Sequence, residues 1–161
     1  MLEIVYRTQV EQALVATLNR VPDGDVLYRQ VGESALWQAA QENRVVPIVA
    51  HALMDTWVSD DVPDHWRLAH EETHTRISAY LAELDRVADR LAEAGIPLVA
   101  LKNGGIARGI YPCPGCCPMG DLDVLVEKRH FRQAHKILLA EGYHFEFRSP
   151  LEEAELAAAE E

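Results

Sequence analysis

Apolar positions in the first 95 residues are spaced as in amphipathic helices. They recur at helical intervals in Val10–Asn19, in Ser34–Asn43 and in Pro47–Trp57, and turn-prone residues separate these segments. Ser34 is a suitable N-cap for the second helix, and a proline such as Pro47 is tolerated in a first helical turn. The pattern therefore predicts a largely helical N-terminal half.

A much longer helix is predicted from Pro63 to about Ala94, with Gly95 ending it. Within this segment one set of side chains recurs every seven residues, and a second set lies beside it. The first set is His70, Ile77, Leu84 and Leu91, and the second is Thr73, Tyr80 and Val87. This spacing predicts one buried stripe along the helix.

The periodicity changes after residue 95. Ile96–Leu101 is short, apolar and partly β-branched, which predicts a buried strand. One or two helical turns are expected in Gly104–Tyr111, a second strand in Asp121–Val126 and an amphipathic helix in His130–Ala140. The alternating segment Tyr143–Phe147 predicts a third strand.

These elements together predict an α+β fold with an α/β core. We expect a helical N-terminal region over residues 1–95, packed on a small mixed sheet within residues 96–148. Residues 149–161 are rich in alanine and glutamate and predict a polar C-terminal helix or tail.

The overall negative charge argues against some classes of binding partner. With 161 residues and a formal net charge of −11, the chain lacks the basic surface expected of a general nucleic-acid binder. Binding of a single nucleotide remains compatible with this charge, because a metal ion can supply the local positive charge. No apolar run approaches the length of a membrane span and the first residues lack signal-peptide features, so we expect a cytoplasmic protein.

The acidic pair Asp121 and Asp123 begins the second predicted strand. Residues two apart on a strand point to the same side, so both carboxylates would share one face. Two neighbouring carboxylates repel each other unless a cation lies between them. Because oxygen ligands suit Mg²⁺, the pair predicts a magnesium site.

In this region the chain resembles a known family. The run "LKNGGIARGIYP…PMGDLDVLVE" follows "LAEAGIPLVA" and precedes "HFRQAHKILLAEGY". This order is similar to that of nucleotidyltransferase-like proteins of the DNA polymerase β-type superfamily, and most similar to a bacterial, mostly uncharacterised group with a helical N-terminal region. The resemblance implies a nucleotidyltransferase core over residues 96–148.

The resemblance also implies an activity and its metal ligands. The activity would be Mg²⁺-dependent transfer of a nucleoside monophosphate from a nucleoside triphosphate to a hydroxyl group of an acceptor. Asp121 and Asp123 would act as catalytic residues by holding the metal ions. The acceptor would be a small molecule or a protein, since the acidic composition argues against nucleic acid.

Two glycines and two basic residues complete the implied nucleotide site. Gly104 and Gly105 lack Cβ atoms and would let the backbone approach the triphosphate. Lys102 or Arg108 would offset the charge that develops on the leaving phosphates. The alternative is structural: the glycines would form a tight strand-to-helix turn, and the aspartates a solvated start to the strand.

Three positions depart from the pattern of these relatives. Asn103 stands where they commonly have glycine, and Cys117 stands where many have arginine. The third carboxylate of the superfamily has one candidate, Glu146, unless it lies on a strand outside this sequence. These departures leave a second hypothesis open, a catalytically inactive binding or assembly module with the same fold.

The segment His70–His74 (HEETH) matches the zinc-protease motif, in which two histidines one helical turn apart bind Zn²⁺. Its extended form is not present, because Ile77 and Tyr80 occupy the positions of the later glycine and histidine. We therefore expect both histidines to line a helical interface or the nucleotide cleft.

A second zinc alternative lies in the cysteine-rich loop. Cys113, Cys116 and Cys117 lie around a Pro-Gly turn that is able to present thiolates to Zn²⁺, with His130 or His135 completing the set. The loop has no second cysteine pair, so the sequence favours a loop of reduced thiols beside the active site, and a redox-sensitive loop is a further alternative.

Overall fold

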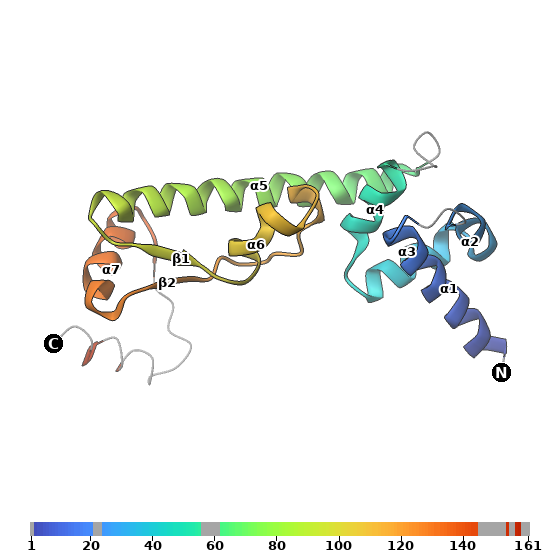
Figure 1. The fold of residues 1–161 in the computed structure, drawn as a ribbon, viewed down its shortest axis with the longest axis horizontal. Helices are drawn as coiled ribbons and strands as arrows, with labels where there is room; N and C mark the ends of the chain where they lie inside the picture. Colours follow the sequence, from blue (N-terminus) through green and yellow to red (C-terminus); the bar gives the residue numbers. More distant parts are fainter. Residues whose placement is uncertain (1, 21–23, 56–61, 145–153, 155–156, 159–161) are drawn as a thin grey trace. The chain divides into compact units, whose positions relative to one another are not determined.

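The computed structural model describes residues 2–20, 24–55, 62–144, 154 and 157–158 (Figure 1). The chain forms two compact units that interleave along the sequence. The first unit contains Met1–Ala79 and Ile106–Gly120, and the second contains Tyr80–Gly105 and Asp121–Glu161. Each unit is described separately below.

The first unit is built from helices. It contains α1 (Leu2–Leu18), α2 (Gly24–Val31), α3 (Glu33–Glu42), α4 (Val46–Asp55), the first part of α5 (Asp64–Glu93), the end of α6 (Lys102–Ile110) and the short 3₁₀ helix η1 (Pro114–Cys116). Figure 1 shows α1 to α4 gathered together, and their buried side chains form one apolar core with Trp66 of α5. Leu36, Val49, Leu53 and Trp66 are at most 1% exposed in this core.

The junction between α2 and α3 corrects two details of the sequence prediction. Helix α2 was not expected, and Ser34 lies inside α3 instead of capping it. Gly32 occupies the N-cap position with a φ of 81°, a left-handed conformation that glycine adopts without steric penalty. This one residue lets α3 begin directly after α2.

The predictions for α4 and α5 are confirmed in position. Pro47 lies in the first turn of α4, and α5 ends at Glu93, just before Gly95 with its φ of 72°. Most of the predicted stripe along α5 is buried, including Ile77 and Leu91. His70 is one of the members of the stripe that stay partly exposed.

The second unit contains a small sheet and one covering helix. Strand β1 (Leu98–Ala100) pairs antiparallel with β2 (Val124–Val126), with Val99 opposite Leu125 (Figure 1). After the 3₁₀ helix η2 (Lys128–His130), α7 (Phe131–Ala140) packs its Ala134 against an apolar cluster. That cluster also contains Val87, Leu91 and Ile96.

The described part of the sheet is antiparallel, and the predicted mixed sheet is not seen there. Residues 143 and 144 of the predicted third strand are not in a strand, and residues 145–147 lie outside the described residues. Within the predicted tail, residues 154, 157 and 158 are helical and the other positions are outside the description. Helices with a small antiparallel sheet agree with the predicted α+β class.

The second strand is shorter than predicted and begins at Val124, so Asp121 and Asp123 precede it. The cause is the end of its partner, since β1 stops at Ala100 and the chain turns into α6. The ladder extends by one further hydrogen bond, from the backbone N–H of Leu101 to the carbonyl oxygen of Asp123 at 2.9 Å. The strand argument for a shared carboxylate face therefore does not apply as stated.

A network of charged side chains joins α5 to the end of α7 within the second unit. Arg86 donates two hydrogen bonds to Glu83, at 2.9 and 2.7 Å, and another to Glu141. Arg90 also donates to Glu141 at 2.7 Å, and the hydroxyl of Tyr143 donates to Glu83. These contacts hold the chain after α7 against the C-terminal part of α5.

None of the described helices combines the length and apolar character that crossing a bilayer requires.

Candidate functional site

Asp123 lies where the sheet meets the first turn of α6. Its backbone carbonyl accepts the N–H of Leu101, and its Oδ2 lies 3.0 Å from the Nζ of Lys102. The side chain of Asp123 is 32% exposed, whereas the side chain of Lys102 is 72% exposed. Asp121, two residues earlier, is exposed. The second unit thus presents carboxylate oxygens and a solvated ammonium group at one end of its sheet.

The backbone of Lys102 is in an unusual conformation. Its φ of 48° lies in the left-handed region, which costs about 1–2 kcal/mol for a residue with a Cβ. Glycine or asparagine would occupy this position more easily. Backbone strain of this kind is concentrated at functional sites, where the surrounding structure holds it in place.

The two glycines of the predicted phosphate site lie in the first turn of α6, and they differ in what surrounds them. A Cβ on Gly105 would lie 2.5 Å from the carbonyl oxygen of Ala100, a separation that real Cβ atoms do not show. A Cβ on Gly104 would lie 3.5 Å from Cδ2 of Leu122, an ordinary contact. Gly105 is therefore required by the close approach of α6 to β1, irrespective of any ligand.

Two other predicted residues lie outside the described part of the second unit. Arg108 lies in the last turn of α6 and belongs to the first compact unit. Glu146 lies outside the described residues. Within the second unit, the predicted site residues that the structure describes are therefore Asp121, Asp123 and the Lys102–Gly105 turn.

A different set of side chains converges in the first unit. His51 of α4, His70 of α5, and Cys113 and Cys116 at the ends of the Pro-Gly turn place their ligand atoms within 4.8 Å of one another. The Sγ of Cys113 lies 3.2 Å from the Nε2 of His70, 3.4 Å from the Sγ of Cys116 and 3.9 Å from the Nδ1 of His51. We call these four residues the His–Cys group.

Burial shifts the pKa of two members of this group, His70 and Cys116. The pKa of His70 is lowered, mainly because burial disfavours the imidazolium and also because His51 and His74 are nearby. Burial, followed by the hydrogen bond with Cys113, raises the pKa of the Cys116 thiol to about 12. Burial therefore favours the neutral imidazole of His70 and the protonated thiol of Cys116.

The turn between the two cysteines lies directly against His70. A Cβ on Gly115 would lie 2.5 Å from the Nε2 of His70 and 2.8 Å from its Cδ2 and Cε1 atoms. Only glycine lets the turn come this close to the imidazole ring. Gly115 thereby brings Cys113 and Cys116 to the ring.

The His–Cys group differs from both zinc sites suggested by the sequence. Two of the three cysteines take part, while Cys117, which is buried, is not among the four residues. Neither His130 nor His135 belongs to the group, and the second histidine of the HEETH segment, His74, is also outside it. His51 was missed, because a single histidine on a separate helix has no motif that connects it to the cysteines.

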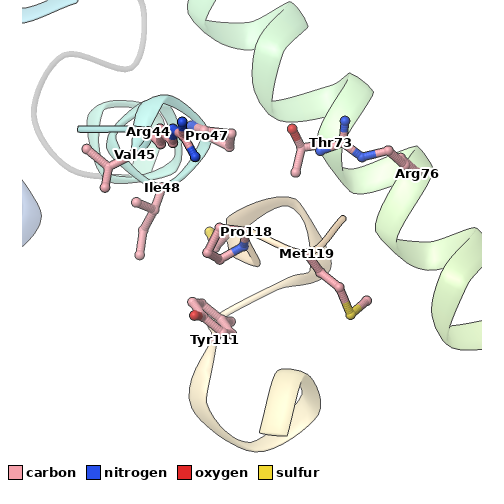
Figure 2. Close-up of a pocket in the computed structure, with 10 residues that line it drawn as sticks. Arg44, Val45, Pro47, Ile48, Thr73, Arg76, Tyr111, Pro118 and Met119 are labelled. Carbon is pink, nitrogen blue, oxygen red and sulfur yellow. The ribbon is translucent and has the colours of Figure 1, made fainter. Parts of the chain in front are cut away.

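A cavity of about 390 Å³ lies next to the His–Cys group in the first unit. Figure 2 shows that its lining residues come from the start of α4, from α5 and from the segment that contains Tyr111 and Met119. Arg44 and Arg76 contribute guanidinium groups, and Cys116 also lines the cavity. Apolar walls with two guanidinium groups suit a small anionic molecule that carries an apolar part.

Comparison with protein families places most of the chain in one of them. Residues 29–158 match the family model described as an uncharacterised nucleotidyltransferase. Comparison with curated proteins and with solved structures finds no match. The matched range includes the sheet, the Lys102–Gly105 turn, both aspartates and the His–Cys group.

Proposed function

Because this chain belongs to the family of uncharacterised nucleotidyltransferases, we propose that it is a Mg²⁺-dependent enzyme that uses Asp121 and Asp123. It would transfer a nucleoside monophosphate from a nucleoside triphosphate to a hydroxyl group of an acceptor and release pyrophosphate. The observation that carries this proposal is the placement of Asp123 beside Lys102 at the first turn of α6. A metal-binding carboxylate, a cation for phosphate and a glycine-containing helix start meet there.

The donor atoms at this position fit magnesium. Asp121 and Asp123 offer carboxylate oxygens only, which is the ligand type that Mg²⁺ prefers. When bound, Mg²⁺ would offset the negative charge of the triphosphate and polarise the phosphoryl group under attack. Asp121 is exposed and lies next to Gly120 in the sequence, so its side chain is accessible to a metal–nucleotide complex.

Lys102 is suited to exchange partners when a nucleotide binds. Its ion pair with Asp123 is largely exposed, and such pairs contribute only about 0–1 kcal/mol, so leaving the carboxylate is inexpensive. In the nucleotide complex, we expect the ammonium group to contact a phosphate oxygen and the Asp123 carboxylate to contact the metal. The ammonium group would then stabilise the charge on the departing pyrophosphate.

The first turn of α6 would contact the triphosphate through its backbone. The N–H of Gly105 donates to the carbonyl oxygen of Leu101 at 3.2 Å, so the phosphate oxygens would approach the N–H groups that precede it, next to Gly104, which carries no side chain. The partial positive charge of a helix N-terminus favours the same placement. The acceptor, in this proposal, is a small molecule or a protein, because the net charge of −11 disfavours nucleic acid.

The test compares binding and turnover in matched variants. Nucleoside triphosphates are titrated with Mg²⁺ and with EDTA against wild type, Asp121→Asn, Asp123→Asn and Asp89→Asn. Asp89 is an exposed aspartate of α5 in the same unit and serves as the control. Pyrophosphate release is then measured with a fractionated cell extract as the source of acceptor.

We expect Mg²⁺-dependent binding by wild type and Asp89→Asn. Pyrophosphate release should fall roughly 10²–10³-fold in each site variant, as when a single preorganised electrostatic group is removed from an active site. Equal binding and turnover by all four proteins would refute the assignment of Asp121 and Asp123. Mg²⁺-dependent binding without any pyrophosphate release would favour the inactive binding or assembly module instead.

A further inference from the structure

We propose that His51, His70, Cys113 and Cys116 bind one Zn²⁺ ion in a closed, structural site. The four residues belong to the first compact unit, whereas Asp121 and Asp123 belong to the second. The proposal is therefore independent of nucleotidyl transfer.

The separations from the Cys113 sulfur are close to those between the ligand atoms of a tetrahedral zinc site. Zinc bonds of about 2.3 Å to sulfur and about 2.0 Å to nitrogen place tetrahedral ligand atoms roughly 3.3–3.8 Å apart. The three separations from the Cys113 Sγ, to His70, Cys116 and His51, are 3.2, 3.4 and 3.9 Å. No ligand atom of the group is more than 4.8 Å from another, so small shifts of the side chains, some together and some apart, would complete the site.

The chemistry of the four ligands selects zinc. Two thiolates and two imidazoles in a tetrahedral arrangement are typical of structural Zn²⁺ sites, whereas Mg²⁺ and Ca²⁺ prefer oxygen. Binding replaces the protons of both thiols with the metal ion, so the two thiolates balance its charge of +2. Four protein ligands leave no position for a water molecule, which distinguishes this site from that of a zinc protease.

The backbone around the site allows the cysteine turn to lie close to the histidine rings. Gly115 brings the turn against the His70 ring, where a Cβ would overlap the ring atoms. The rings of His51 and His70 stack with centroids 5.5 Å apart and planes inclined by 21°. Helices α4 and α5 and the cysteine turn, which are separate along the sequence, thus direct their ligand atoms to one point.

Two simpler explanations account for less of this arrangement. Weak thiol–imidazole hydrogen bonds explain the contacts of Cys113 but not the convergence of a second histidine and a second cysteine. A Cys113–Cys116 disulfide would require a separation of about 2.05 Å, whereas both cysteines are free and their sulfur atoms are 3.4 Å apart.

The experiment measures zinc in protein purified under reducing conditions without chelator. We expect about one Zn²⁺ per chain by elemental analysis, given four convergent ligands. Removal of the metal with a chelator should lower Tm, and addition of Zn²⁺ should restore it. Replacement by Co²⁺ should give the visible absorption of a tetrahedral ion and a thiolate-to-cobalt charge-transfer band.

Matched variants identify the ligands. His70→Gln, His51→Gln and Cys116→Ser should each weaken Zn²⁺ binding by more than the ~10–100-fold seen when a residue that only supports a ligand is lost. His74→Gln and Cys117→Ser are the controls, because they alter the neighbouring histidine and thiol outside the group. Gly115→Ala keeps all four ligand residues and should weaken binding, because its Cβ displaces the ring of His70.

Several results would overturn the proposal. These are wild-type protein that binds neither Zn²⁺ nor Co²⁺ when reduced, isolation with a Cys113–Cys116 disulfide, or unchanged affinity in His51→Gln and His70→Gln. If a ligand variant does not fold, the Co²⁺ spectrum of the wild type decides. A spectrum without thiolate charge transfer or without tetrahedral bands refutes the site.

Discussion

The ammonium group of Lys102 lies 3.0 Å from the Oδ2 atom of Asp123, across the point where the sheet ends and α6 begins. The two residues are brought together by the last hydrogen bond of the ladder, which joins Leu101 to Asp123. Lys102 thus holds its charge beside a carboxylate that we propose as a metal ligand. The backbone of Lys102 is in a left-handed conformation, which is unfavourable for lysine.

Because of this strain, we expect a substitution of Lys102 to affect nucleotide binding without lowering the stability of the fold. Lys102→Asn removes an exposed ion pair contributing about 0–1 kcal/mol, while asparagine tolerates the left-handed region better than lysine. We expect Tm to stay the same or rise and the affinity for Mg²⁺·NTP to fall. Thermal unfolding and nucleotide titration measure the two effects. A clear loss of stability with unchanged affinity would contradict this role for Lys102.

The two glycines of α6 should respond differently to the same substitution. Gly105→Ala places a Cβ against the carbonyl oxygen of Ala100, and we expect a loss of about 1–3 kcal/mol in the free energy of unfolding, as for other overpacked sites. Gly104→Ala is the control, because its Cβ would make an ordinary contact with Leu122. Chemical denaturation compares the two variants, and equal losses would be inconsistent with the described approach of α6 to β1.

Glu33 should be important for the stability of the first unit. Its Oε1 accepts the indole N–H of Trp66 at 2.9 Å and lies 2.7 Å from Nε2 of His65. Because Trp66 is fully buried, Glu33→Ala leaves its N–H without this acceptor, at a cost of about 1–3 kcal/mol. Glu33→Gln retains an acceptor and should lose less.

The control for Glu33 is Glu42→Ala, which removes only an exposed contact with Gln38 on the same helix. Urea denaturation followed by tryptophan fluorescence measures all three variants. If Glu33→Ala were as stable as Glu42→Ala, the hydrogen bond to Trp66 would not be formed in solution.

The hydrogen bonds of Glu83 predict that the stability of the fold decreases at low pH. Hydrogen bonds from Arg86, and then from Tyr143, lower the pKa of Glu83 from 4.5 to about 2. A lowered folded-state pKa stabilises the fold above the unfolded value, and this stabilisation is lost as the pH falls from 4.5 towards 2. In Glu83→Gln, the decrease in Tm over this range should therefore be smaller than in wild type.

Glu93→Gln provides the comparison for this pH dependence, because it removes a more exposed carboxylate from the same helix. Tm is measured at intervals from pH 7 to pH 2. The dependence of Tm on pH should be the same for Glu93→Gln as for wild type, whereas the decrease in Tm at acid pH should be smaller for Glu83→Gln. Identical curves for the two variants would exclude the Glu83 network as a source of acid sensitivity.

The helices were the most predictable part of this fold. The long α5 helix follows from a sustained seven-residue repeat, and Gly95 after it has the left-handed φ that ends helices. The short α2 helix was not predicted, since its eight residues begin with Gly24 and Asp25 of the turn-prone Pro-Asp-Gly-Asp run and give too few periods to recognise. Tertiary packing of α2 against α1 and α3 stabilises it.

The strand that follows Asp121 shows why local pattern alone misplaces an element's end. Alternation along residues 121–126 predicts a strand from the first aspartate, but a strand extends only as far as its partner. Ala100 ends that partner, because the chain then turns into α6. The start of β2 was therefore decided by the neighbouring segment.

The sequence by itself determined the helical N-terminal half, the α+β class and the order of lysine, glycines and aspartates that marks a nucleotidyltransferase. These features are local, because they depend on periodicity and on residues adjacent in the chain. Only the tertiary structure decided which histidines meet Cys113 and Cys116, since His51 and His70 come from different helices. Convergence of distant side chains follows from how helices pack, and no local pattern contains that information.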